Sequence, residues 1–185
     1  MLDDVKKDAN ERMNKCVAAL KNELKKLRTG RAHTSLLEHI RVEYYGNEVP
    51  LNQVANLALE DARTLTVTPW EKTMVQAIEK AIMKSDIGLM PNVDGTVVRL
   101  NIPPLTEERR KDIVRSVHKR MEEARVEVRN VRREANDALK KEERDGEVGA
   151  DDVRRQLETL QKLTDRFVGD VDRLGDVKEQ EVMEV

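Results

Sequence analysis

The sequence is short of cysteine, of aromatic residues and of long apolar runs. Cys16 is the one cysteine among 185 residues, so the chain cannot form a disulfide within itself and we expect a reducing compartment. Its place on an apolar helical face favours a core position over a role as a nucleophile. No apolar run approaches the roughly 18 residues that a membrane-spanning helix needs, and the acidic start at Asp3 and Asp4 is unlike a signal or transit peptide. We therefore expect a cytoplasmic protein that does not enter a membrane.

Motifs that carry chemistry are also missing. The sequence has no C-x-x-C or H-E-x-x-H spacing, no G-x-x-x-x-G-K-[ST] phosphate loop, no G-x-G-x-x-G after a strand and no G-x-S-x-G elbow. The histidines, His33, His39 and His118, are isolated. The carboxylate pairs Asp3-Asp4, Glu107-Glu108 and Asp151-Asp152 each open a predicted helix, where capping explains them better than acid–base catalysis does. We predict that the protein is not an enzyme and that it holds no metal ion and no cofactor.

Charged residues make up 38% of the chain, and their distribution is uneven behind a net charge of -2. Residues 1–30 hold eight basic and five acidic side chains, residues 105–133 hold ten and six, and residues 134–185 hold nine and sixteen. Aromatic residues make up only 2%, so recognition by base stacking is not expected. Basic segments without aromatics are suited to contacts with nucleic-acid phosphates.

A long amphipathic helix is predicted for residues 107–144. Pro103 and Pro104 prevent an earlier start, Thr106 can cap the first turn, and no breaker occurs before Gly146. At about 1.5 Å per residue this helix is roughly 57 Å long, so other helices must pack along it. Its apolar seam recurs at spacings of four and three and consists of Ile113, Val117, Met121, Ala124, Val128, Val131, Ala135 and Ala138.

The charges on this helix are sorted by sign. With about 100° per residue, one line beside the seam, which we call the basic line, comprises Lys111, Arg115, His118, Arg125, Arg129 and Arg132, with Arg133 at its edge and Glu122 as an acidic interruption. An acidic line comprises Asp112, Glu123, Glu127, Glu134 and Asp137. One interpretation is a solvated face with i,i+4 ion pairs. The other is an anion-binding face, which the segregation favours because clustered arginines repel one another unless an anion lies opposite.

Two further long helices should pack against this seam. The first covers residues 3–29, is ended by Gly30, and places inward Val5, Ala9, Met13, Cys16, Leu20, Leu24 and Leu27. The last begins at Asp151 and Asp152, contains Gly169 and Gly175, and places inward Val153, Leu157, Leu160, Leu163, Phe167, Val171, Leu174 and Val177. Three long helices with matched seams predict an elongated antiparallel three-helix bundle.

The period changes between the first two helices. Strand-like segments are predicted at residues 40–45, 54–59, 64–68 and 96–102, a short helical turn at residues 32–38, and a helix at residues 72–84. We therefore predict an α+β protein in which residues 1–30 and 104–185 form the bundle and residues 31–103 form a small inserted α/β domain, mostly β. The two crossings between the domains are a predicted hinge and consist of Thr29, Gly30, Arg31, Pro103, Pro104 and Leu105.

Four stretches in this order resemble one known family. They are Leu27-Arg28-Thr29-Gly30-Arg31-Ala32, then Val42-Glu43-Tyr44-Tyr45-Gly46, then Pro103-Pro104-Leu105-Thr106-Glu107-Glu108-Arg109-Arg110-Lys111, and Ala124-Arg125-Val126-Glu127-Val128-Arg129-Asn130-Val131-Arg132-Arg133. They look like the bacterial ribosome recycling factor over essentially the whole chain. The sequence departs from the family mainly at residues 47–59, around Trp70 and in the acidic C-terminal third.

The resemblance implies an L-shaped monomer that binds ribosomal RNA of the large subunit. With elongation factor G, such a factor separates the subunits of the post-termination ribosome, and the partner hydrolyses the GTP. DNA and membranes are not implied as partners. The RNA-binding role is carried most firmly onto Arg129 and Arg132, and then onto Arg125, Arg133, Arg110, Arg28 and Arg31. The alternatives are a scaffolding or chaperone-like bundle with a basic protein-docking face and, less favoured, an enzyme sited in the insert.

Overall fold

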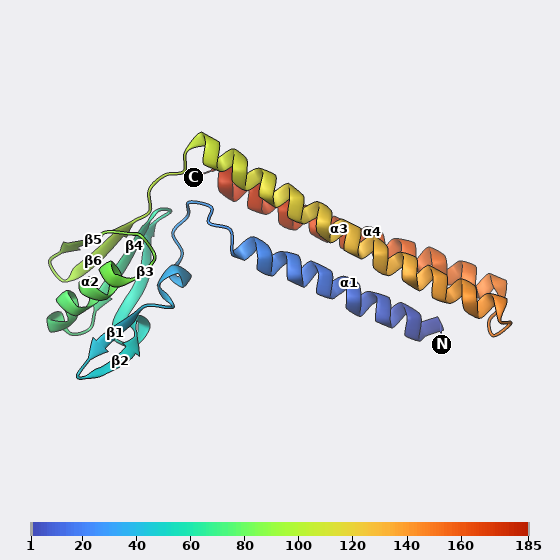
Figure 1. Ribbon diagram of the computed structural model, residues 1–185, viewed down its shortest axis with the longest axis horizontal. Helices are drawn as coiled ribbons and strands as arrows, with labels where there is room; N and C mark the ends of the chain where they lie inside the picture. The colour runs from blue at the N-terminus through green and yellow to red at the C-terminus, as the bar shows by residue number, and fades with distance from the viewer. Residues whose placement is uncertain (1, 185) are drawn as a thin grey trace. The chain divides into compact units, whose positions relative to one another are not determined.

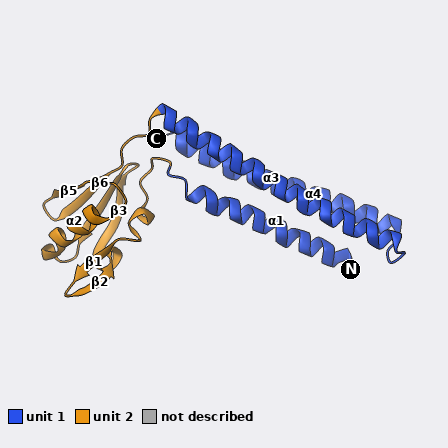
Figure 2. Cartoon of the chain, viewed as in Figure 1, with its two compact units in different colours: residues 1–28, 107–184 blue, residues 29–106, 185 orange. Residues whose placement is uncertain are grey.

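The structure, a computed structural model, describes residues 2–184 and divides into two compact units (Figure 2). The first comprises the chain up to residue 28 together with residues 107–184, and the second comprises residues 29–106. The boundary on the first crossing thus lies two residues earlier than the sequence indicated, and the boundary on the second lies three residues later.

The first unit is a bundle of three long helices, α1 (Leu2–Lys25), α3 (Glu107–Arg144) and α4 (Ala150–Met183) (Figure 1). The bounds of α3, which has 38 residues, are those that the sequence predicted. α3 runs antiparallel to α4, to which a turn at Gly146 connects it, and each helix contacts the other two. The predicted bundle and the α+β class are confirmed.

α1 ends earlier than predicted. The amides of Lys26 and Leu27 bond to the carbonyls of Glu23 and Leu24 at 3.3 and 3.2 Å, so the last turn tightens to i,i+3 spacing. Gly30 lies in the second unit and has φ +79°, which a right-handed helix cannot accommodate. The predicted end at Thr29 is therefore wrong, because the chain leaves the helix in order to enter the other unit.

The core of the bundle follows the predicted seam, with two corrections. The buried residues of α3 are Ile113, Val117, Met121, Ala124, Val128, Val131, Ala135 and Leu139. Ala138 is exposed, and Leu139 takes its place because the last step is four residues rather than three. On α4, Val177 is 56% exposed instead of facing inward. In the C-terminal part of α4 the buried positions are Gly175 and Val182 instead, so the seam of α4 shifts by one residue at Gly175.

Gly175 is buried because the side chain of Met121 occupies the space that a Cβ would need. A Cβ built on Gly175 would lie 2.7 Å from Met121 Cγ, far inside van der Waals contact. A glycine in a helix interior costs about 0.8–1.0 kcal/mol relative to alanine. Here it lets Met121 of α3, which is 5% exposed, fill a hollow in the surface of α4.

The second unit is built on antiparallel strands. One sheet has the order β3 (Ala55–Asp61), β4 (Thr64–Pro69), β6 (Val97–Asn101) and β5 (Pro91–Asp94), and a separate hairpin pairs β1 (Arg41–Tyr44) with β2 (Asn47–Pro50). The helical elements are α2 (Val75–Lys84) and short 3-10 turns at Thr34–Leu37, Leu51–Gln53 and Lys72–Met74. Its core includes Leu37, Val42, Leu51, Leu65, Val67, Ile78, Ile82, Val98 and Leu100.

All four predicted strands and the predicted helix are present, but β2 and β5 were missed. Each contains a single valine among polar residues and one proline, so neither alternation nor β-branched enrichment marks it as a strand. β5 lies at the edge of its sheet, where a short and polar strand is tolerated.

The two crossing segments are fixed to the same turn between β3 and β4. The amide of Ala32 donates to the carbonyl of Ala62, and the amide of Ile102 donates to the carbonyl of Arg63, both at 2.8 Å. Gly30 lies against Leu105, and a Cβ added to it would be 2.8 Å from Leu105 Cγ. Both the left-handed backbone and the close approach therefore require glycine at position 30.

Candidate nucleic-acid interface

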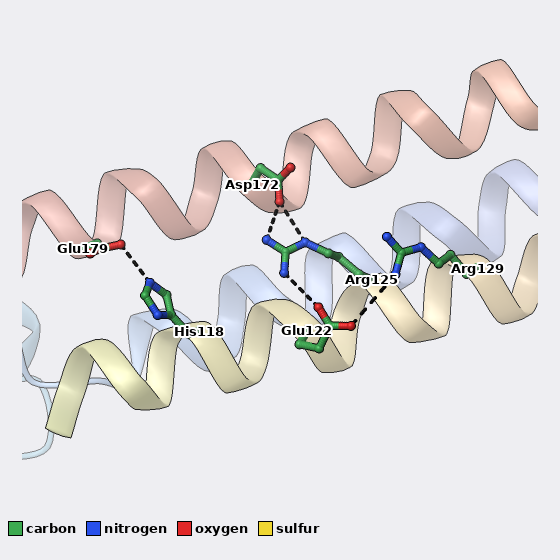
Figure 3. A network of polar contacts seen from close by, with 6 residues as sticks. All are labelled: His118, Glu122, Arg125, Arg129, Asp172 and Glu179. Atoms are coloured by element: carbon green, nitrogen blue, oxygen red, sulfur yellow. Dashed lines mark hydrogen bonds and ion pairs between the residues drawn. The ribbon is translucent and has the colours of Figure 1, made fainter. Parts of the chain in front are cut away.

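The basic line of α3 lies beside α4 and meets a row of polar and acidic side chains on that helix. His118 Nε2 is 3.0 Å from Glu179 Oε2, and Arg132 donates to Gln161 Oε1 at 2.8 Å. Between these two contacts, Arg125 bonds to Asp172 (Figure 3). The line is thus placed as predicted beside the seam, but α4 supplies a partner to three of its members, His118, Arg125 and Arg132.

Arg125 is the most constrained member of the line. Its Nε and Nη2 donate to Asp172 Oδ1 at 2.9 and 2.6 Å, and its Nη1 donates to Glu122 Oε2 at 3.0 Å. These hydrogen bonds, above all those that Asp172 accepts, raise the pKa of the guanidinium further above its usual value. Its side chain is 23% exposed, so Arg125 ties α3 to α4 and has little surface left for another anion.

Glu122 lies between two arginines of its own helix. While Oε2 accepts from Arg125, Oε1 lies 3.9 Å from Arg129 Nη1 (Figure 3). The long second distance makes Glu122 a weak partner for Arg129, whose side chain is 47% exposed. Arg129 therefore presents a largely free guanidinium to solvent.

Arg132 and Arg133 complete the exposed end of the line. The partner of Arg132, Gln161, is a neutral amide whose Nε2 in turn donates to Asp165 Oδ1 at 2.9 Å. Arg133 is exposed and makes no hydrogen bond or ion pair with any residue from 2 to 184. The guanidiniums of Arg129, Arg132 and Arg133 thus have little or no direct carboxylate compensation, and all three lie within little more than one turn of α3.

The start of the line fits the solvated-face interpretation better. Lys111 Nζ is 3.0 Å from Glu107 Oε1, and Arg115 Nη2 is 3.4 Å from Asp112 Oδ1. Both are exposed pairs within one turn of the helix, of the kind that stabilises by no more than about 0.5 kcal/mol. The anion-binding interpretation therefore applies to the segment around Arg129 rather than to the whole line.

The acidic line faces α1. Glu134 accepts from Arg12 of α1 at 2.5 Å, and nearby Arg120 pairs with Glu23 of the same helix. Burial first, and then Glu127, raises the pKa of the Cys16 thiol, which keeps it protonated and poorly nucleophilic. Cys16 packs against the core, as predicted. Part of the segregation of signs on α3 thus has partners inside the bundle, since Glu134 of the acidic line pairs with α1 and Arg125 of the basic line pairs with α4.

The three remaining predicted arginines lie elsewhere. Arg28 is exposed just beyond α1, and Arg31 is exposed in the second unit. Arg110 lies on the apolar side of α3, as its periodicity indicated, and is half-buried. Its Nε is buried without a hydrogen-bond partner among the residues that the structure describes. None of the three is among the residues of the polar network that Figure 3 shows.

Sequence reasoning missed the partners on α4, although a signal for them exists. His118, Arg125 and Arg132 are seven residues apart on α3, and Glu179, Asp172 and Asp165 are seven residues apart on α4. In an antiparallel pair such heptad spacing brings each basic residue opposite an acidic one. Two of the three pairs make direct contacts, and Gln161 links Arg132 to Asp165.

Other kinds of site find no support between residues 2 and 184. In this range no three His, Cys, Asp or Glu side chains are grouped so that they could hold a metal ion. The helices of the described chain include none that is long and apolar enough to cross a bilayer.

Comparison with known proteins points in one direction. The profile of the family described as ribosome recycling factor matches residues 20–183. A ribosome-recycling factor of Thioalkalivibrio sulfidiphilus is 58% identical over 185 residues, 100% of both chains, and one of Nitrosococcus oceani is 55% identical over 185 residues, 100% of this chain and 99% of the other.

Two solved structures are similar over nearly the whole length. A solution structure of the ribosome recycling factor has a TM-score of 0.73 and 46% identity, and it covers 100% of this chain and 98% of the other. Models for the T. thermophilus ribosome recycling factor and the E. coli elongation factor G bound to the E. coli post-termination complex give a TM-score of 0.62 and 47% identity, with 98% of both chains covered.

Proposed function

This chain belongs to the ribosome recycling factor family, and on that premise we propose that it binds the post-termination ribosome and, with elongation factor G, separates the subunits for reuse. A relative 47% identical over 98% of the chain is described together with elongation factor G on the post-termination complex, which supports both partners. In this proposal elongation factor G hydrolyses the GTP, which agrees with the absence of a phosphate-binding loop motif from this sequence. The protein acts in the compartment in which ribosomes translate.

The single observation that carries the RNA contact is the exposed group of guanidiniums at Arg129, Arg132 and Arg133. Arg129 and Arg133 are offset from the acidic residues of α4 that contact α3. Arg132 is bonded to a neutral amide of α4, that of Gln161. With two aromatic residues in every hundred, the chain is suited to phosphate contacts and shape rather than to stacking on bases. Contacts of this kind are sequence-independent and weaken steeply with salt, which suits a factor that must bind and then leave.

Arg125 has a different role in this proposal. Its three nitrogens already have carboxylate partners, so it holds α3 against α4 and keeps the neighbouring arginines in place. Arg110, Arg28 and Arg31 are secondary candidates for RNA contacts near the crossings. The crossings themselves serve as the hinge, with the flexible positions at the unit boundaries after residue 28 and before residue 107.

The test is binding of the full-length chain to vacant bacterial ribosomes by cosedimentation at several salt concentrations. Arg129→Ala and Arg132→Ala should each weaken binding and make the slope of log affinity against log salt shallower by roughly 0.7–0.9, as expected for one phosphate contact. Because Arg129 is exposed and Arg132 is only partly buried with a neutral partner, their loss should change the free energy of unfolding by no more than about 0.5 kcal/mol. Glu127→Ala, on the acidic line, is the control and should leave binding unchanged or slightly stronger.

Arg125→Ala should show the opposite profile. Removing it leaves Asp172 without its partner across the α3–α4 contact, so we expect a loss of stability of about 1 kcal/mol and a smaller change in salt slope. If Arg129→Ala and Arg132→Ala bound with wild-type affinity and slope, the basic line would be a solvated face. Salt-sensitive capture of unfolded proteins instead of ribosomes would favour the scaffolding or chaperone-like alternative.

A further inference from the structure

Glu122 is the one acidic residue within the basic line, and its contacts are unlike those of the other carboxylates in the network. Asp172 and Glu179 reach α3 from α4 and so connect two helices. Among residues 2–184, the ion-pair partners of Glu122 are Arg125 and Arg129, both on its own helix. By the antiparallel register that aligns Arg125 with Asp172, the residue of α4 opposite Glu122 is Gly175, which has no side chain to bond to it.

This placement argues against a structural role for Glu122. Its side chain is 58% exposed, and it ties no second helix into the bundle. The two bonds from Arg125 to Asp172 use Nε and Nη2 and do not involve Glu122, which accepts from Nη1. What the carboxylate does change is the electrostatics: with Asp172 it balances the two guanidiniums of Arg125 and Arg129, so that this part of the line carries no net charge.

We propose that Glu122 is an internal counterion that competes with ribosomal RNA phosphate for Arg129. In the free protein its Oε1 lies 3.9 Å from Arg129 Nη1, a position from which a phosphate oxygen can displace it. Once displaced, the carboxylate stays close to the bound polyanion and repels it. Glu122 thereby lowers the affinity of the basic line and speeds release. This inference rests on the proposed RNA contact of Arg129.

The substitution Glu122→Gln removes the competing charge and keeps the size and polarity of the side chain. An exposed ion pair and a like charge near a phosphate each change an equilibrium only a few-fold, so we expect ribosome binding to tighten by about three- to tenfold at low salt. The gain should shrink as salt is raised, because the carboxylate and the phosphates are both exposed to screening. Dissociation should slow by a similar factor.

A matched control is available at the next residue. Glu123→Gln makes the same change in net charge, but the side chain is exposed on the acidic line, away from Arg129. It should alter binding by less than about twofold, as expected for a charge that lies farther from the RNA. Circular dichroism and urea unfolding should show that both glutamine variants are folded, with stabilities close to that of the wild type.

The double variant Glu122→Gln/Arg129→Ala decides whether the effect acts through Arg129. In the Arg129→Ala background the gain from Glu122→Gln should largely disappear, since there is no guanidinium left to compete for. A full gain in that background, an equal gain from Glu123→Gln, or weaker binding by Glu122→Gln would each overturn the counterion proposal. Those results leave the RNA contact standing as long as Arg129→Ala alone weakens binding. If Arg129→Ala has no effect, the RNA contact itself fails.

Discussion

Gly169 and Gly175 lie on the same helix, yet a methyl group added to each should change stability in opposite directions. At Gly169 the nearest atom to a new Cβ is Arg173 Nη1 at 3.6 Å, an ordinary contact. Gly169→Ala should therefore gain the usual helix preference of alanine and raise the free energy of unfolding by about 0.5–1 kcal/mol. At Gly175 the same gain is opposed by overlap with Met121, whose Cγ would lie 2.7 Å away.

The overlap at Gly175 should win. Met121 is 5% exposed and is enclosed by the seam, so it must leave its rotamer or push α3 and α4 apart. Overpacking of this kind costs about 1–3 kcal/mol, which exceeds the helix-propensity gain of about 1 kcal/mol. We expect Gly175→Ala to lower the free energy of unfolding by about 1 kcal/mol, roughly 2 kcal/mol below Gly169→Ala.

Urea unfolding followed by far-ultraviolet circular dichroism measures this difference, because most of the helix signal comes from the bundle. The midpoints should move in opposite directions at an unchanged slope. In a Met121→Ala background the obstructing side chain is gone, so Gly175→Ala should become stabilising. If Gly175→Ala stabilised the wild type as much as Gly169→Ala does, Met121 would be free to move and the close approach of α3 and α4 would not depend on the glycine.

Two further predictions concern the second unit. Gly30→Ala should destabilise it by about 1–3 kcal/mol, because alanine is strained at φ +79° and its Cβ meets Leu105; Gly88→Ala, at φ +69° with open space around it, is the control and should cost less in the same unfolding assay. Tyr44 and Tyr45, the only tyrosines of the chain, both donate to Glu71, and these bonds raise the pKa of each phenol above 10.0. An absorbance titration should therefore show both phenols ionising above that value, and Glu71→Gln should lower the midpoint. Because the phenol pKa values are raised in the folded state, these bonds contribute fully to stability at pH below the pKa of the unfolded chain, and the contribution is lost as pH rises through the pKa of the folded protein. A titration unchanged by Glu71→Gln would contradict the contacts.

The long helices could be predicted from the sequence because each carries its signals locally. Two prolines precede Glu107 and a glycine follows Arg144, so caps and breakers mark α3 at both ends. β2 and β5 could not be found in this way, since their pairing partners rather than their own composition make them strands. The end of α1 was missed for a similar reason. Gly30 looked like a helix stop, but its positive φ serves the contact with Leu105.

The candidate site was predictable in its residues but not in its balance of charge. Helical periodicity placed Arg125, Arg129 and Arg132 on one line, and the structure places them there. Which of them is neutralised depends on Asp172, which is 47 residues from Arg125 along the chain. Only an assumed antiparallel register between α3 and α4 would have brought the two together before the structure was known.

That register explains how one line of charges can both hold the bundle together and keep guanidiniums available for an external anion, which we propose to be RNA phosphate. Positions seven residues apart, at His118, Arg125 and Arg132, recur at the same angle toward α4; the first two contact Glu179 and Asp172, and the third contacts Gln161. Arg129 is four residues beyond Arg125, so it is rotated by about 40° away from that row. Among residues 2–184, Arg129 has Glu122 as its ion-pair partner at 3.9 Å. Arg133, a further turn along, makes no hydrogen bond or ion pair with these residues. The spacing of three and four that forms an apolar seam thus also divides the arginines. Arg125, which is in register with a carboxylate of α4, stabilises the helix pair, whereas Arg129 and Arg133, which are out of register, and Arg132, which meets a neutral amide, are left for an external anion.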